Sequence, residues 1–277
     1  MRRLVAFLAA SLLTLALAGP ALAAPGSSGD HAVMYYLSLG DSFAASQQPA
    51  PGSWDNGYTE QLYAMAKATY PKLRHVKLGC AGGETTTTFI DGGVCDYPHG
   101  SQLDEAVGFL RAHRQFVAFV TIDIGWNDFT CIDEVACVYG GLATIGTNLP
   151  RILDELRAAA GPDVQIVGGT VYDPLLALWF TDPPKAQLSV DVIAGTATTP
   201  GVNDYVAGIY ASRGMPVADV EGAFFTTDWT MTAYGMPLNV LTVCAWTGVC
   251  NPQEPDNHPN TLGYAAMTRA YAAVLGL

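Results

Sequence analysis

Short apolar runs alternate with segments of helical spacing along most of this chain. The apolar runs are rich in β-branched and aromatic residues, which favours buried strands. They lie at Val33–Leu39, Val76–Leu78, Phe116–Ile124, Val164–Val167 and Val217–Val220. Segments with helical spacing lie at Tyr58–Tyr70, Gln102–His113, Leu149–Ala160, Asn203–Ser212 and Thr261–Leu275. This alternation predicts an α/β fold with a mostly parallel sheet and helices on both of its faces.

The first residues follow a different pattern. Two arginines precede an apolar run from Leu4 to Ala18, and small residues follow up to Ala23. This is the layout of a secretory signal peptide, and we expect cleavage after Ala23. The apolar core is shorter than the roughly 20 residues that span a bilayer. We therefore predict a secreted protein without stable membrane insertion, in which residues 1–23 are the signal peptide and residues 24–277 form a single domain.

The charge balance argues against a nucleic-acid partner. The chain has 13 Lys and Arg against 25 Asp and Glu, which gives a formal net charge of −12 at pH 7. Such a surface repels phosphate backbones, and no cluster of basic residues interrupts it. We expect no binding of nucleic acid.

Six cysteines occur, all beyond the signal segment. An even number in an exported chain favours disulfides. Six cysteines allow 15 pairings, of which three local loops are the most economical: Cys80–Cys95, Cys131–Cys137 and Cys244–Cys250. The chain has no Cys-x-x-Cys pair and the compartment is oxidising, so we expect no metal site.

Polar motifs follow several of the predicted strands, at the edge where such sheets bind their ligands. A Gly-Asp-Ser motif at residues 40–42 ends the first run, and Gly-Glu-Thr at 83–85 follows the second. Gly-Trp-Asn-Asp at 125–128 ends the third run, and His-Pro-Asn at 258–260 precedes the last helix. Gly-Asp-Ser alone is also an ordinary turn, so the interpretation depends on the four motifs together.

These motifs, in this order, resemble the four blocks of the SGNH (GDSL) hydrolase family, over nearly the whole chain beyond the signal segment. The cysteine-bearing segments are similar to those of secreted actinobacterial lipases and esterases in that family. The resemblance implies a flavodoxin-like, doubly wound sheet of five strands with helices on both faces. It also implies Ser42 as nucleophile and His258 as general base. The implied oxyanion hole consists of the N–H groups of Ser42 and Gly83 and the side-chain amide of Asn127.

The chemistry also follows from the residue types. A neutral serine hydroxyl is a poor nucleophile and needs a base within hydrogen-bond reach. An imidazole suits this role near neutral pH, and His258 is the candidate. The other histidines are expected to be solvated or structural: His31, His75, His99 and His113. The Gly-x-Ser-x-Gly signature is absent, which disfavours an ordinary α/β-hydrolase.

Other side chains in the motifs are given supporting roles. Asp41 and Asp128 are expected to bond loop backbone, because an aspartate adjacent to the nucleophile projects away from it. Trp126, Trp54 and Phe43 are candidates for an acyl pocket, although aromatic residues more often belong to the core.

The residues before His258 depart from the family pattern. Most family relatives have an aspartate three residues before the histidine, where this chain has Pro255. Asp256 lies two residues before His258 and Glu254 four before, so neither inherits the usual geometry. The favoured interpretation is a Ser-His pair in which a backbone carbonyl of the 246–255 loop supports the ring. A triad with Asp256 as third member is the alternative.

Together these features predict a secreted esterase or lipase that cleaves acyl esters through an acyl-enzyme on Ser42. We expect a monomer that acts on small-molecule or lipid esters without a cofactor. A carbohydrate deacetylase of the same fold is the alternative enzyme, and a non-catalytic secreted binding protein is the rival of a different class. Residues 173–199 are rich in Pro, Leu, Trp and Phe, and could form an apolar rim for a lipid chain or a packed connection.

Overall fold

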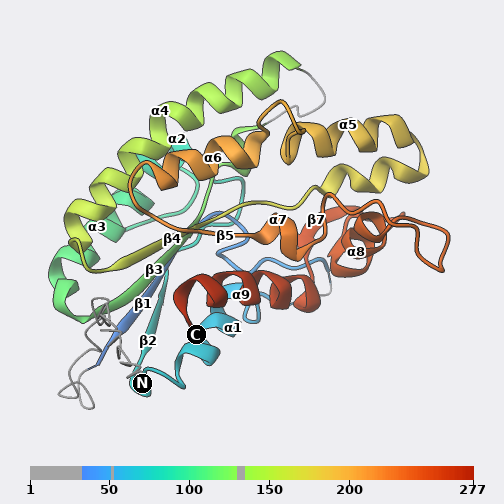
Figure 1. Cartoon of the computed structure of the whole chain (residues 1–277). Helices are drawn as coiled ribbons and strands as arrows, with labels where there is room; N and C mark the ends of the chain where they lie inside the picture. Colours follow the sequence, from blue (N-terminus) through green and yellow to red (C-terminus); the bar gives the residue numbers. More distant parts are fainter. Residues whose placement is uncertain (1–32, 51–52, 130–134) are drawn as a thin grey trace, which may run out of the picture. The chain divides into compact units, whose positions relative to one another are not determined.

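A five-stranded parallel sheet is the centre of the structure (Figure 1). The computed structural model describes residues 33–50, 53–129 and 135–277. The strands are β1 (Tyr35–Gly40), β2 (Arg74–Lys77), β3 (Val117–Asp123), β4 (Gln165–Gly169) and β5 (Val217–Ala218). Their spatial order is β2-β1-β3-β4-β5, and every neighbouring pair is parallel. Each strand overlaps one of the predicted apolar runs.

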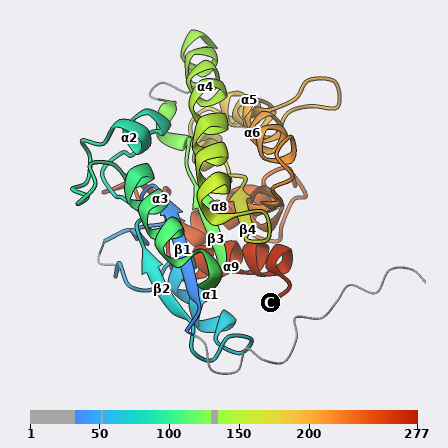
Figure 2. The ribbon, with the colours of Figure 1, turned by 90° about the vertical axis from the view of Figure 1, so that its left-hand side faces the viewer.

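Helices cover both faces of this sheet (Figures 1 and 2). One face carries α2 (Thr86–Asp91), α3 (Gln102–His113), α4 (Val135–Ala160) and α6 (Val202–Ala211), and the other carries α1 (Tyr58–Ala66) and α9 (Thr261–Leu275). Side chains alternate along each strand, so Leu37 and Leu39 pack with the first set and Tyr36 with the second. The predicted flavodoxin-like, doubly wound architecture is confirmed.

Helix α4 begins earlier than the sequence pattern indicates. The apolar spacing predicts a helix from Leu149, whereas α4 already begins at Val135 and contains Pro150. Glycine and threonine between residues 140 and 147 lower the helix propensity, and a proline removes one backbone donor. The helix continues because Ile145 and Leu149 are fully buried in the core. Tertiary packing therefore overrides the local preference.

The segment between β4 and α6 forms two further helices. The 3-10 helix η3 (Pro174–Phe180) precedes α5 (Pro183–Ile193), and each begins with proline in its first turn. Leu176 is buried, whereas Phe180 and Leu188 are 57% and 60% exposed. The segment thus packs against the core on one side and leaves apolar side chains on the other.

The C-terminal part adds a small ribbon that carries His258. Helices α7 (Val220–Ala223) and α8 (Leu238–Trp246) precede β6 (Thr247–Gly248), which pairs antiparallel with β7 (Asp256–Pro259). The Cys244–Cys250 disulfide joins the end of α8 to the residues after β6. The Cys80–Cys95 disulfide ties the loop after β2 to the segment between α2 and α3.

Some sequence predictions concern residues outside the described ranges. The signal peptide at residues 1–23 lies there, as do His31 and Cys131 of the expected Cys131–Cys137 pair. Within residues 33–50, 53–129 and 135–277, no helix is long and apolar enough to cross a membrane. The same residues contain no group of three or more His, Cys, Asp or Glu side chains placed to hold a metal ion.

Candidate active site

The loop after β1 presents Ser42 at the carboxyl edge of the sheet. Strand β1 ends at Gly40, whose φ is +131°. A Cβ atom at this position would lie 1.9 Å from the carbonyl oxygen of Asp123, so only glycine fits. The chain then turns, with the N–H of Phe43 donating to the Asp41 carboxylate at 2.9 Å. Asp41 therefore bonds loop backbone, as expected from its position beside Ser42, and Ser42 is left partly exposed.

His258 lies directly against Ser42. Its Nε2 is 2.9 Å from the Ser42 hydroxyl, although 216 residues separate the two in sequence. The ring is largely buried, and Phe43 packs against it edge to face with centroids 5.9 Å apart. A neutral Nε2 at this distance can accept the serine proton, which is the geometry that a general base requires.

The carboxylate of Asp256 orients this histidine. Its Oδ1 lies 2.5 Å from Nδ1 of His258 and also accepts the backbone N–H of His258 at 2.8 Å. The favoured interpretation of the sequence, a backbone carbonyl from the 246–255 loop as partner of the ring, is therefore wrong. The contact corresponds to the alternative, in which Asp256 is the partner of His258.

The correction has a simple geometric cause. Residues 256–259 form strand β7, and side chains two positions apart in a strand point to the same side. An aspartate at position 256 therefore meets the ring of His258 without the turn that a three-residue spacing needs. The ribbon is held in place by the hydroxyl of Tyr172, which donates to the carbonyl of Asn257.

Asn127 and Gly83 lie on two neighbouring loops. Asn127 belongs to a 3-10 turn, η2 (Trp126–Asp128), directly after β3. Its side-chain amide donates to the carbonyl of Glu84 at 3.0 Å and more weakly to Asp41 at 3.4 Å. Gly83 is exposed with φ of +90°, and the space where a Cβ would lie is open. The Asn127 amide thus contacts Glu84, the residue after Gly83, and Asp41, the residue before Ser42.

Asp128 connects these two loops. Its carboxylate accepts the backbone N–H of Thr86 at 2.9 Å and the hydroxyl of the same residue at 2.7 Å. Asn148 of α4 donates to the Thr86 hydroxyl at 3.2 Å and so supports the joint. Asp128 therefore bonds backbone, as expected, and sets the position of Asn127 relative to Gly83.

We predict that Asp128→Ala lowers kcat by about 10 to 10²-fold, less than the 10² to 10³ that follows loss of an oxyanion donor itself. The contact between the two loops loosens, but the two groups expected to bind the oxyanion, the Asn127 amide and the Gly83 N–H, remain. Two charge-assisted hydrogen bonds also disappear, so the free energy of unfolding should fall by about 1.5 to 3 kcal/mol. Ester kinetics and urea unfolding measure the two effects. Asp154→Ala, at an exposed ion pair with Arg213, is the matched control, and equal kinetics for the two variants would contradict the role of Asp128.

Buried acidic groups surround the site, and the sequence motifs did not reveal all of them. Burial raises the pKa of Asp41 to about 7. Burial and then the charge of Asp41 raise the pKa of Glu84 to about 7. Burial and the neighbouring Asp41 also raise the pKa of Asp123, whose two oxygens are inaccessible and have no hydrogen-bond partner among the described residues. The sequence could have indicated Asp123 as one of these buried acids, because it is a lone carboxylate in an apolar strand.

This arrangement predicts that stability falls as pH rises. The pKa of Asp123 is higher in the folded protein than in the unfolded chain, where it is about 3.9. Between pH 4 and the raised pKa of the folded state, Asp123 therefore binds its proton more fully in the folded protein than in the unfolded chain, and within this range each step upward in pH favours unfolding. Asp123→Asn is neutral throughout, so it should be more stable than wild type at pH 8, by about 1 to 3 kcal/mol. The difference should shrink toward pH 4.

Urea unfolding at pH 5 and pH 8 measures this difference. Asp154→Asn, which removes an exposed carboxylate, should show the same pH dependence as wild type. If Asp123→Asn also did so, the account of Asp123 would be wrong.

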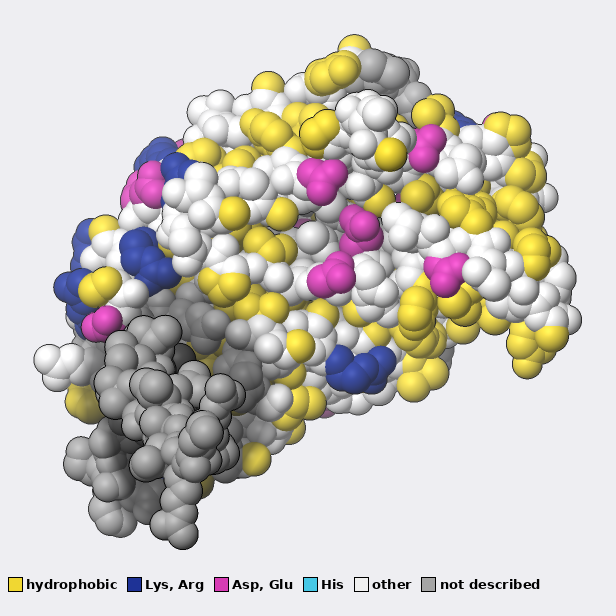
Figure 3. Space-filling view, in the orientation of Figure 1, with side chains coloured by type: hydrophobic (Ala, Val, Ile, Leu, Met, Phe, Trp, Pro, Cys, Tyr) yellow, Lys and Arg dark blue, Asp and Glu magenta, His cyan; other side chains and the backbone are white. Residues whose placement is uncertain are grey.

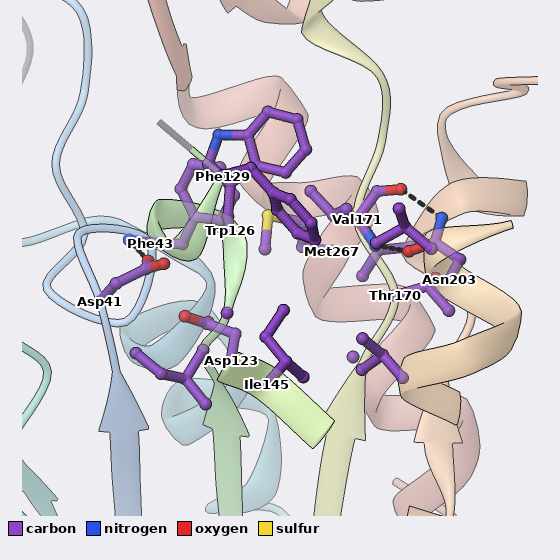
Figure 4. Close-up of a pocket in the computed structure, with 16 residues that line it drawn as sticks. Asp41, Phe43, Asp123, Trp126, Phe129, Ile145, Thr170, Val171, Asn203 and Met267 are labelled. Atoms are coloured by element: carbon purple, nitrogen blue, oxygen red, sulfur yellow. Dashed lines mark hydrogen bonds between the residues drawn. The ribbon is translucent and has the colours of Figure 1, made fainter. Parts of the chain in front are cut away.

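A small cavity of about 40 Å³ lies beside the nucleophile loop (Figure 4). Phe43, Trp126 and Phe129 line it together with Ile145 and Met267. Two of the three aromatic candidates for an acyl pocket are therefore present. Trp54 is not among the lining residues and is 52% exposed.

Of the other described histidines, His75 and His113 pack against aromatic rings, and His99 is exposed. His75 stacks on Tyr36 and bonds the hydroxyl of Ser38 at 2.8 Å, and burial lowers its pKa to about 4. His99 pairs with Glu105. His113 contacts the carbonyl of Phe109.

The chain belongs to the GDSL-like lipase/acylhydrolase family, whose model matches residues 38–266. Membership of this family makes it an enzyme that hydrolyses carboxylic esters. Among the curated proteins, none matches this chain.

Solved structures share the fold at low sequence identity. The lipase Lip_vut3 from a goat rumen metagenome is 13% identical with a TM-score of 0.54, and the match covers 87% of this chain and 96% of that chain. The acetylxylan esterase Axe2 from Geobacillus stearothermophilus is 17% identical with a TM-score of 0.52, covering 88% and 94%. At such identities the likeness shows the fold alone.

Proposed function

We propose that this chain is a secreted hydrolase that cleaves carboxylic esters through an acyl-enzyme on Ser42. The observation that carries the proposal is the continuous contact from Ser42 to His258 to Asp256, with distances of 2.9 and 2.5 Å. A nucleophile, a base and a group that orients the base are the parts that acyl transfer requires. The same contacts argue against a non-catalytic binding protein.

In the acylation step the Ser42 hydroxyl oxygen attacks the ester carbonyl carbon while Nε2 of His258 takes its proton. The carbonyl oxygen becomes an oxyanion. The N–H groups of Ser42 and Gly83 and the amide of Asn127 donate to it. The intermediate then expels the alcohol oxygen, which receives the proton from His258, and the acyl group stays on Ser42. Asp256 stabilises the imidazolium and keeps Nε2 directed at Ser42.

Deacylation repeats these steps with water. His258 takes a proton from water, the resulting hydroxide attacks the acyl carbon, and the same donors bind the second oxyanion. Collapse releases the carboxylic acid and returns the proton to the oxygen of Ser42. The weak contact between Asn127 and Asp41, at 3.4 Å, leaves one amide hydrogen available for the oxyanion.

Export is supported by two features of the chain. The N-terminal residues have the pattern of a signal peptide, and the Cys80–Cys95 and Cys244–Cys250 disulfides suit an oxidising compartment. N-terminal sequencing of the protein from culture medium should begin after Ala23. Retention inside the cell would contradict export without affecting the chemistry.

A hydrolysis panel tests the activity. Purified protein should hydrolyse p-nitrophenyl esters from acetate to palmitate, and acetylated xylan should be a poor substrate. Release of acetate from xylan with little turnover of the p-nitrophenyl esters would instead identify a carbohydrate deacetylase. Folded protein that hydrolyses none of these esters would overturn the proposal.

A further inference from the structure

We infer that the acyl group of the substrate is a medium or long alkyl chain, and that it occupies a second cavity between α4 and α5. This inference rests on the proposed ester hydrolysis at Ser42 and specifies its substrate class. It gives a role to residues 173–199, which the catalytic groups leave unexplained.

The second cavity has a volume of about 320 Å³. Its apolar walls come from the first turns of α4, from η3 and α5, and from the start of α6. The apolar side chains are those of Val138, Leu142, Leu175, Leu188, Val192 and Val202. The volume falls at the lower end of the range for small-molecule sites, which is about 300 to 1,000 Å³.

The second cavity adjoins the first. Val202 at the start of α6 lines both. The first cavity is lined by Phe43 and Trp126, the neighbours in sequence of Ser42 and Asn127. Val202 is 4% exposed and forms part of the wall between the two cavities. A chain that leaves the carbonyl carbon at Ser42 along these two aromatic rings would pass this side chain to enter the second cavity. The 40 Å³ of the first cavity holds no more than the first carbons, and the second receives the rest.

The polar side chains that line the second cavity are fewer than the apolar residues: Tyr139, Lys185, Ser189, Asp191 and Thr199. Ser189 already donates to the carboxylate of Asp173 at 2.6 Å and contacts the carbonyl of Ala186 at 2.9 Å. Asp191 accepts from Gln187. A bound carbohydrate would need several hydrogen bonds from walls that are mostly alkyl, and its unpaired hydroxyls would oppose binding. An alkyl chain needs none.

The rim of the cavity is also apolar. Tyr139 of α4 and Leu188 of α5 line it and are 69% and 60% exposed. Figure 3 shows hydrophobic side chains gathered over α5 and the segments beside it. An exposed apolar surface that leads into an apolar cavity marks a binding site for an apolar group.

Ester kinetics below the critical micelle concentration test this inference. Each buried methylene should raise kcat/KM by about fourfold until the cavity is filled. Wild type should therefore prefer p-nitrophenyl laurate over the acetate by at least about 10²-fold. Leu142→Trp and Val192→Trp fill the cavity from opposite walls, and each should lower the laurate-to-acetate ratio by at least about 30-fold. Met65→Trp, on exposed α1 at the other face of the sheet, should leave the ratio unchanged.

A second measurement uses wild type alone, so its result does not depend on whether the variants fold. Dodecanoate should compete with the ester substrate, whereas acetate at the same concentration should not. A preference of wild type for the acetate, an unchanged ratio in folded filling variants, or equal inhibition by both acids would overturn the inference. Each of these outcomes still requires ester turnover, so they differ from the failure of the proposed function, in which no ester is hydrolysed.

Discussion

Replacing Ser42 by alanine should lower kcat by about 10⁴ to 10⁶-fold, in the range found when a serine hydrolase loses its nucleophile. The acyl-enzyme cannot form without the hydroxyl, and the remaining rate reflects the donors and substrate binding alone. The fold should survive, because the side chain is partly exposed and loses one hydrogen bond with His258, which costs about 0.5 to 1.5 kcal/mol.

Steady-state kinetics with a p-nitrophenyl ester, together with circular dichroism, measure this effect. Ser212→Ala, at the C-cap of α6, is the matched control, since it removes an exposed serine hydroxyl whose bond goes to the carbonyl of Ile209, and it should retain wild-type kinetics. Turnover by Ser42→Ala above about 1% of wild type would mean that another residue is acylated.

The second large effect is expected for Asp256→Asn, which should lower kcat by about 10² to 10⁴-fold. Asparagine keeps the size of the side chain but removes its charge. The imidazolium that forms during acylation then loses the carboxylate that lies 2.5 Å from its Nδ1. The amide can also favour the wrong tautomer of His258, in which Nε2 carries the proton and cannot act as base.

Glu254→Gln provides the control for Asp256→Asn. It neutralises an exposed acid in the same loop, four residues before His258, and should change kcat by less than about twofold. If Asp256→Asn cost less than about tenfold with the fold intact, the carboxylate would be dispensable and a different group would orient the ring.

The sheet could be predicted because its strands are buried on both faces. Residues such as Tyr36 and Leu37 pack into opposite cores, so β1 appears in the sequence as an uninterrupted apolar run. Helix α9 was predicted with the bounds that the structure has, since its apolar spacing begins directly after an asparagine cap. The first turns of α4 and all of α5 were not predicted as helices, because their stability comes from packing that local propensity does not encode.

The parts of the site that could be predicted are those whose chemistry follows from the type of residue. The structure brings Ser42 and His258 into contact, and it places Asn127 beside the loop of Gly83. Asp256 was only the alternative partner of His258, because a turn was assumed before the histidine, whereas an extended strand aligns residues two apart. The raised pKa of Asp123 depends on how deeply its side chain is buried in the fold. The sequence pattern shows only that a single carboxylate lies in a strand.

Peptide mapping after reaction with a fluorophosphonate tests the central claim most directly. The reagent phosphonylates an activated serine, because a nearby base removes its proton and fluoride leaves. The account predicts one adduct per chain, located on Ser42, that is absent in Ser42→Ala and forms far more slowly in His258→Ala. An adduct on another serine, or an unlabelled folded chain that still hydrolyses esters, would contradict it.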